Sequence, residues 1–87
     1  TRSLAREVGD DGICVNCIAP GLTMSEAIMN SDQFVDNFEV NLVNRAIKRA
    51  EQPEDLLGAM VYLCSSDSDF VTGQTLVVDG GMMKTVW

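Results

Sequence analysis

The chain has 87 residues, of which 46% are hydrophobic and 22% charged, a composition that suits one small globular domain. Thirteen acidic residues against six basic ones give a formal net charge of −7, which argues against nucleic-acid partners and against anionic membrane surfaces. No apolar run approaches the roughly 20 residues of a transmembrane helix, and no signal peptide is visible. We therefore expect a cytoplasmic protein.

Residues 1–9 have the pattern of an amphipathic helix, because Leu4, Ala5 and Val8 fall on one face. Gly9 suits the position just after the last helical turn. The helical pattern is already present at Thr1, so we expect that the chain is a piece of a larger protein.

A short apolar run from Ile13 to Ile18 is rich in β-branched residues and predicts a parallel strand covered on both faces. Pro20 and Gly21 follow it and predict the end of the strand, because proline lacks the N–H that a sheet ladder needs.

Cys14 and Cys17 form a C-x-x-C, a spacing that in a cytosolic protein suggests a redox or zinc site. In a strand, however, residues three apart face opposite sides and lie about 10 Å apart, which is too far for a disulfide. The chain has no histidine to complete a zinc site. We therefore expect no metal, and expect these two residues and Cys64 to be small buried thiols.

From Thr23 to about Ala50 the pattern is helical but irregular. Ser25 is a candidate N-cap for a short helix over residues 25–30, and a second helix is predicted to begin near residue 31 or 32. Large flexible and aromatic side chains make this segment adaptable, and both core packing and a substrate-facing lid fit it: Met24, Met29, Phe34 and Phe38.

Pro53 opens the clearest predicted helix, with Glu54 and Asp55 favourably placed in its first turn. A wide apolar stripe predicts that this helix is well buried: Leu56, Leu57, Met60, Val61, Leu63 and Cys64. A second buried strand is predicted over residues 75–79, closed by two glycines. The order strand, helix, strand implies two parallel strands joined by a crossover, and hence an α/β fold that forms one end of a larger doubly wound sheet.

Several sequence blocks occur in the order typical of one enzyme family. Residues 15–25 (VNCIAPGLTMS) resemble V-N-x-x-x-P-G-x-x-x-T, and residues 72–81 (TGQTLVVDGG) resemble T-G-Q-x-x-x-V-D-G-G. Between them, residues 52–56 and 62–67 resemble a P-E-D helix and its end, while residues 1–7 resemble the helix that follows a catalytic lysine. Together these blocks resemble the classical short-chain dehydrogenase/reductase (SDR) family.

The resemblance implies a Rossmann-type fold, hydride transfer between NAD or NADP and a small alcohol or carbonyl substrate, and a homo-oligomer such as a dimer or tetramer. Residues 1–87 would form the C-terminal part of a single Rossmann-type domain, with a substrate loop over about 23–50. The catalytic serine, the Y-x-x-x-K pair and the glycine-rich phosphate turn of the family are not among these residues; the single tyrosine, Tyr62, begins no such motif. We therefore expect no catalytic residue here, and no activity from these 87 residues alone.

The resemblance also assigns cofactor contacts to the segment after the first strand. Pro20 and Gly21 would lie against the nicotinamide, backbone at Leu22 and Thr23 would meet its carboxamide, and the Ser25 hydroxyl would reach the amide or a phosphate. The alternative for the Pro-Gly pair is a simple strand terminator.

The other motif residues are given structural roles. Asn16 is expected to tie neighbouring loops together, and residues 79–81 to form the turn after the last strand, near subunit contacts in the family. A second functional hypothesis stays open: a stand-alone, non-catalytic oligomerisation module derived from the same family.

Overall fold

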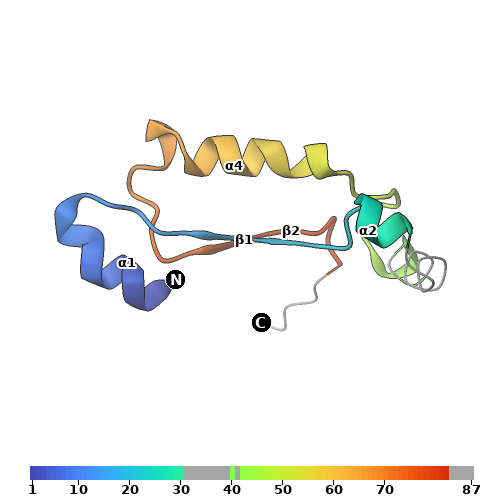
Figure 1. Ribbon diagram of the computed structural model, residues 1–87, viewed down its shortest axis with the longest axis horizontal. Coiled ribbons are helices and arrows are strands. Elements are labelled where there is room, and N and C mark those ends of the chain that lie inside the picture. Colours follow the sequence, from blue (N-terminus) through green and yellow to red (C-terminus); the bar gives the residue numbers. More distant parts are fainter. Residues whose placement is uncertain (31–39, 41, 83–87) are drawn as a thin grey trace. The chain divides into compact units, whose positions relative to one another are not determined.

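The computed structural model describes residues 1–30, 40 and 42–82 (Figure 1). Its elements follow in the order α1 (Arg2–Val8), η1 (Gly9–Asp11), β1 (Cys17–Pro20), α2 (Glu26–Met29), η2 (Pro53–Leu56), α4 (Leu57–Leu63), η3 (Ser66–Ser68) and β2 (Thr75–Val78). Two compact units are formed, one from Thr1–Ala19 and Leu57–Val77, the other from Pro20–Leu56 and Val78–Trp87. The predicted α/β class is confirmed.

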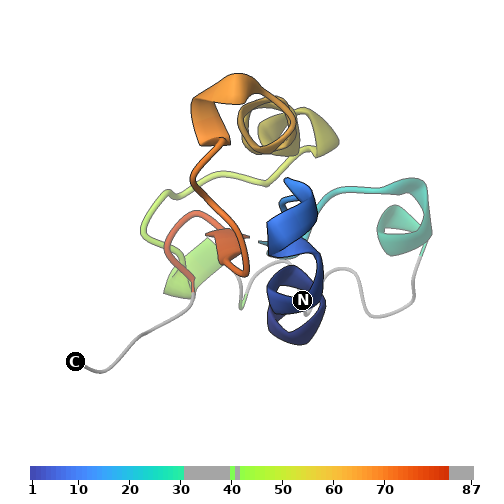
Figure 2. The ribbon, with the colours of Figure 1, turned by 90° about the vertical axis from the view of Figure 1, so that its left-hand side faces the viewer.

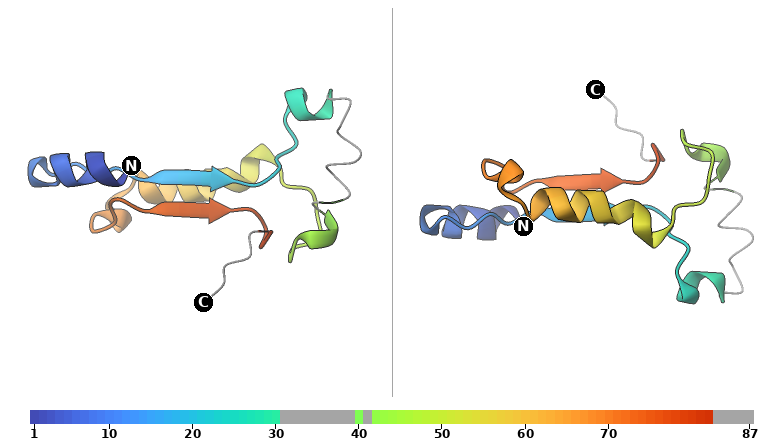
Figure 3. Two further views of the ribbon diagram at one scale, coloured as in Figure 1. Left: turned by 90° about the horizontal axis from the view of Figure 1, so that it is seen from below. Right: turned by 90° about the horizontal axis from the view of Figure 1, so that it is seen from above.

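The two strands pair with each other and run in the same direction, as Figure 3 shows. The Cys17 N–H donates to the Gln74 carbonyl at 2.9 Å, and the Gly21 N–H donates to the Val78 carbonyl at 3.0 Å. Pro20 is the last residue of β1, two positions beyond the predicted end at Ile18, and the expectation that Pro20 and Gly21 end the strand is confirmed. Because successive residues of a strand point their N–H groups to opposite sides, the missing N–H of Pro20 falls on the side away from β2.

The sequence pattern predicts that the first strand begins at Ile13, but in the structure it begins at Cys17. Upstream of Cys17 the backbone bonds to the loop before β2: the Val15 N–H donates to the Thr72 hydroxyl at 3.0 Å, and the Gly73 N–H donates to the Val15 carbonyl at 2.8 Å. A side-chain acceptor thus replaces the ladder there, and no regular strand forms.

In the first unit, α4 runs along one face of the strands, and α1 lies on the opposite side (Figures 1 and 2). Ala5 of α1 is buried, whereas Leu4 on the same predicted face is half exposed. The α-helix ends at Val8 with Gly9 as its C-cap, as expected, but Gly9 is right-handed and begins η1. The left-handed residue is Gly12, with φ of 76°, whose N–H donates to the Gly9 carbonyl at 3.0 Å.

The expectation of a well-buried helix after Pro53 is wrong for this chain. The chain first makes the 3-10 turn η2, and in α4 the side chains of Leu57, Met60 and Val61 are all more than half exposed. A two-stranded sheet covers only one side of the helix, so most of its wide apolar stripe has nothing to pack against within the unit.

Two further burial expectations fail for the same reason. β2 is largely exposed, and Cys14 and Cys64 are exposed thiols rather than buried ones, while Cys17 is half-buried.

In the second unit, the predicted cap of α2 is confirmed, because the Ile28 N–H donates to the Ser25 hydroxyl at 3.3 Å. Residues 40 and 42–44 are helical. The predicted start of this helix near residue 31 or 32 lies outside the described residues. Across the described part of the chain, every helix is too short or too polar to span a membrane.

Candidate functional site

The backbone turns sharply after β1, and its hydrogen bonds hold the turn in place. The Thr23 hydroxyl donates to the Gly21 carbonyl at 3.0 Å, and the Met24 N–H donates to the Glu51 carbonyl at 2.8 Å. Among the described residues, no acceptor receives the N–H of Leu22 or of Thr23. The turn therefore presents two neighbouring backbone donors that have no acceptor within the described residues.

Gly21 occupies a position where a side chain has no room. A Cβ atom built on it would lie 2.9 Å from both the Asp79 Cβ and the Glu51 Oε1, and 3.1 Å from the Asp79 Cα. Its φ is not positive, so space and not backbone strain requires glycine here. The sequence had explained this glycine by a close approach to a cofactor ring; the structure adds a close approach within the chain itself.

The Ser25 hydroxyl already serves α2. It accepts the Ile28 N–H, while the Ser25 N–H donates to the Thr23 carbonyl at 2.8 Å. A hydroxyl that accepts one hydrogen bond keeps its own proton to donate. The expected contact from Ser25 to a cofactor stays a prediction, with the hydroxyl as donor.

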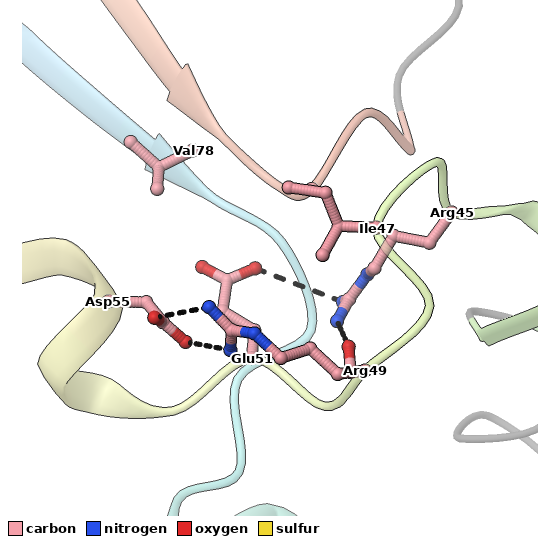
Figure 4. Close-up of a pocket in the computed structure, with 7 residues that line it drawn as sticks. Arg45, Ile47, Arg49, Glu51, Asp55 and Val78 are labelled. Atoms are coloured by element: carbon pink, nitrogen blue, oxygen red, sulfur yellow. Dashed lines mark hydrogen bonds and ion pairs between the residues drawn. The ribbon is translucent and has the colours of Figure 1, made fainter.

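The structure reveals a buried ion pair beside the turn, which sequence reasoning missed. Arg45 is 3% exposed and Glu51 is 5% exposed, and the Arg45 Nη2 lies 3.8 Å from the Glu51 Oε1 (Figure 4). Arg45 also donates from Nη1 to the Arg49 carbonyl and from Nη2 to the Leu22 carbonyl, both at 3.0 Å. The Arg45 Nε and both Glu51 carboxylate oxygens make no hydrogen bond within the described residues.

A second ion pair lies at the same hollow but is open to solvent. Arg49 donates to the two carboxylate oxygens of Asp55 at 2.7 and 2.8 Å, and the Gln52 N–H donates to the same carboxylate at 2.8 Å. The Arg49 guanidinium, with help from this backbone donor, holds the pKa of Asp55 well below its usual range. The hydrogen bond from Arg49 to Asp55 in turn raises the pKa of Arg49.

The two ion pairs border one cavity of about 160 Å³. Its lining combines the charged groups with apolar side chains and a backbone turn: Arg45, Ile47, Arg49, Glu51, Asp55, Val78 and Gly80 (Figure 4).

The turn after β2 is confirmed at residues 79–81. Gly80 and Gly81 are left-handed, with φ of 65° and 82°, and the Gly81 N–H donates to the Asp79 carboxylate at 2.9 Å. The Ile47 N–H donates to the Gly80 carbonyl at 2.9 Å. A Cβ at Gly80 would lie 2.9 Å from the Arg45 Cδ, so this turn packs closely on the buried arginine.

The predicted structural role of Asn16 is also confirmed. Its amide donates to the Val71 carbonyl at 2.9 Å, and its oxygen accepts the Gln74 N–H at 3.1 Å. One side chain thus satisfies two backbone groups of the loop that precedes β2.

The remaining sequence candidates separate in the structure. Met24 is buried at 8% exposure, which favours packing, whereas Met29 is half exposed and free to face a ligand. Phe34 and Phe38 lie outside the described residues. The described residues contain no group of three metal-ligating side chains, and Cys14, Cys17 and Cys64 are free thiols.

Comparison with known proteins settles the family. The model of the enoyl-(acyl carrier protein) reductase family matches residues 1–83. The chain belongs to the short-chain dehydrogenase/reductase family. The resemblance drawn from its sequence blocks is thereby confirmed, and so is the Rossmann-type fold that it implied.

Two of the individual relatives described next are oxidoreductases by name, and the third is solved with NADPH. The A-factor type γ-butyrolactone 1′-reductase (1S-forming) of Streptomyces virginiae is 45% identical over 93% of this chain and 32% of the relative. A short-chain dehydrogenase from Leptospira borgpetersenii, solved with bound NAD⁺, is 39% identical with a TM-score of 0.78, over 94% of this chain and 30% of that one. A blue fluorescent protein from a metagenomic library, in complex with NADPH, is 28% identical with a TM-score of 0.79, over 97% and 33%. The SDR chain spans about one third of the length of the curated relatives it matches.

Proposed function

We propose that this chain is the C-terminal third of a single Rossmann-type domain in an NAD(P)-dependent oxidoreductase. The whole protein would transfer hydride between a nicotinamide cofactor and a small alcohol or carbonyl compound. Membership of the SDR family supports this, as do structural relatives with bound NAD⁺ or NADPH. Both NAD and NADP fit the residues described here.

The observation that carries the proposal is the turn after β1. Ligands of parallel α/β sheets lie beyond the carboxyl ends of the strands; Pro20 is the last residue of β1, and Gly21 directly follows it. The N–H groups of Leu22 and Thr23, which have no acceptor in the part of the chain that the structure describes, follow at once. They match the acceptor of a carboxamide group, so the residues present fit a nicotinamide.

Each residue of the turn then has a defined task. The flat backbone at Pro20 and Gly21 lies against the ring and excludes water from one face, while the Leu22 and Thr23 N–H groups orient the carboxamide. Ser25 donates its hydroxyl proton to the cofactor and keeps its cap on α2. The cofactor supplies the hydride chemistry. The catalytic acid–base groups would come from residues of the whole protein outside this chain.

The wider surroundings of the turn are assigned in the same way. Residues 23–50 form the substrate loop, in which exposed Met29 offers an apolar contact to the substrate. Free thiols at all three cysteines agree with a reducing compartment such as the cytoplasm.

The second candidate is a non-catalytic association module. It is favoured by the exposed apolar surface of α4 and by Phe70, whose side chain is fully exposed. A homo-oligomer is compatible with both functions, because SDR enzymes and an association module would each cover such surface with a second copy.

The two functions differ in an assay on the full-length protein. Reduced-nicotinamide absorbance is followed with NAD(H) and NADP(H) and a panel of secondary alcohols and ketones, and sedimentation velocity is run on the same sample. An oxidoreductase gives turnover with at least one cofactor. A stable oligomer that neither binds nicotinamide cofactors nor shows turnover would support the association module instead.

A further inference from the structure

We propose that the buried Arg45–Glu51 pair is a positioning device for the turn of residues 21–24, and so sets the affinity for the nicotinamide end of the cofactor. This inference rests on the proposed function, since it assumes that the turn meets the nicotinamide. Neither residue would touch the cofactor; both would act through the backbone that they hold.

The two residues meet the turn at Gly21, Leu22 and Met24. Glu51 accepts the Met24 N–H through its carbonyl, and its Oε1 lies where a side chain of Gly21 would stand. Arg45 donates to the Leu22 carbonyl at 3.0 Å. The bond to the Leu22 carbonyl fixes the peptide plane that carries the Thr23 N–H, and the bridge between Thr23 and Glu51 fixes the next plane along the chain.

Arg45 is itself anchored on its other side. Its Nη1 donates to the Arg49 carbonyl, and its aliphatic stem packs against Gly80 in the turn after β2. The guanidinium therefore links the turn after β1 to two other backbone segments, and a shift of this one side chain would move the Leu22 peptide.

The two charges also depend on each other. Both are more than nine-tenths buried, and Arg45 is the sole ion-pair partner of Glu51 in the described residues. If one partner is removed, the other charge stays buried without its nearest counter-charge, and the local backbone must move to hydrate it. The turn of residues 21–24 lies directly beside the buried pair, so the backbone geometry of this turn would change.

The neighbouring Arg49–Asp55 pair provides a matched control. It borders the same cavity, has shorter contacts, and is likewise a pair of an arginine with a carboxylate. Its Arg49 side chain is 58% exposed and donates to no atom of the turn. Arg49→Gln removes a charge near the site but leaves in place the Arg45 side chain and the Arg49 carbonyl that accepts from it.

The test compares two ligands by calorimetric titration of the full-length protein: NADH and ADP-ribose, or their 2′-phosphorylated forms if the protein uses NADP. ADP-ribose shares every part of the cofactor except the nicotinamide. Glu51→Gln is expected to weaken NADH binding by at least about fivefold, the lower end of typical couplings between sites, and to leave ADP-ribose affinity within about twofold. Arg49→Gln should change neither.

If Glu51→Gln does not fold, Arg45→Lys provides a second test of the proposal. Lysine retains the buried positive charge but lacks the planar guanidinium that donates to two carbonyls at once. This variant should also weaken NADH and spare ADP-ribose. Combined with Glu51→Gln it should lose less than the sum of the two single losses, because both act on one contact.

Equal losses for NADH and ADP-ribose, or purely additive effects, would overturn the positioning role and leave the pair a general structural element. A wild-type protein that binds NADH no more tightly than ADP-ribose would instead contradict the proposed function itself.

Discussion

Replacing Gly21 by alanine should destabilise the protein by an amount set by the space around its Cα. The new methyl carbon would lie 2.9 Å from the Asp79 Cβ and 3.1 Å from the Asp79 Cα, while carbon atoms prefer separations of about 3.5–4.0 Å. The Asp79 Cα belongs to the backbone of the turn after β2, so relief requires a backbone shift. Overpacking of this kind costs about 1–3 kcal/mol.

Gly58→Ala is the matched control for this change. Gly58 lies in α4, and a Cβ there would meet no atom within 4 Å. Alanine in a helix is favoured over glycine by about 1 kcal/mol, so this variant should be more stable than wild type. The two alanine variants should therefore differ by about 2–4 kcal/mol.

Urea unfolding of the full-length protein at one protein concentration measures the difference. The midpoints should shift in opposite directions with little change in the slope m. If Gly21→Ala unfolds at the wild-type midpoint or above it, the close packing of Gly21 against Asp79 is not present in solution, and this reasoning fails.

Three further predictions concern other parts of the chain. Asn16→Ala should lower the free energy of unfolding by about 1–3 kcal/mol, because it leaves two backbone groups unpaired. Gln74→Ala removes an exposed amide with one long hydrogen bond to the Thr72 carbonyl and should change the free energy of unfolding by less than about 0.5 kcal/mol; equal effects of the two variants would refute the structural role of Asn16. Because the pKa of Asp55 is lowered in the folded state, its contribution is complete above the ordinary aspartate pKa of about 3.9 and declines as pH falls below it. Between pH 6 and pH 3, the urea midpoints of Asp55→Asn and Arg49→Gln should therefore fall by less than the midpoint of wild type. Equal falls in all three proteins would show that the Arg49–Asp55 pair does not stabilise the fold. The 87 residues alone should show no NAD(P)-dependent turnover, and activity abolished by Tyr62→Phe would disprove that expectation.

Local chemistry was readable from the sequence. The cap of α2 by Ser25 was predictable, because a serine hydroxyl just before a helix lies within reach of a free backbone N–H of the first turn, here that of Ile28. The strand pair followed from two apolar runs separated by a crossover. Asn16 was assigned correctly because an amide beside a strand end has few partners other than loop backbone.

Features that depend on distant residues were missed. Whether the strand begins at Ile13 or Cys17 is decided by Thr72 and Gly73, more than fifty positions away. The burial of α4 was overestimated. An apolar stripe shows how much apolar surface a helix presents, but it does not show whether other residues of the chain cover that surface.

The buried ion pair had no sequence signal. Arg45 belongs to a short basic cluster and Glu51 to a polar stretch, and both patterns are typical of solvent-exposed surface. Only the fold shows that the two residues are buried and that they meet beside the Leu22 peptide.

The central claim is that the turn after β1 binds the nicotinamide end of the cofactor through the Leu22 and Thr23 N–H groups. Amide hydrogen exchange of the full-length protein, read on a peptide covering residues 20–25, tests it most directly. The account predicts slower exchange at this peptide with NADH or NADPH than with the corresponding ADP-ribose, which lacks the nicotinamide. Equal protection by both ligands, or no protection by a cofactor that binds elsewhere in the protein, would contradict it.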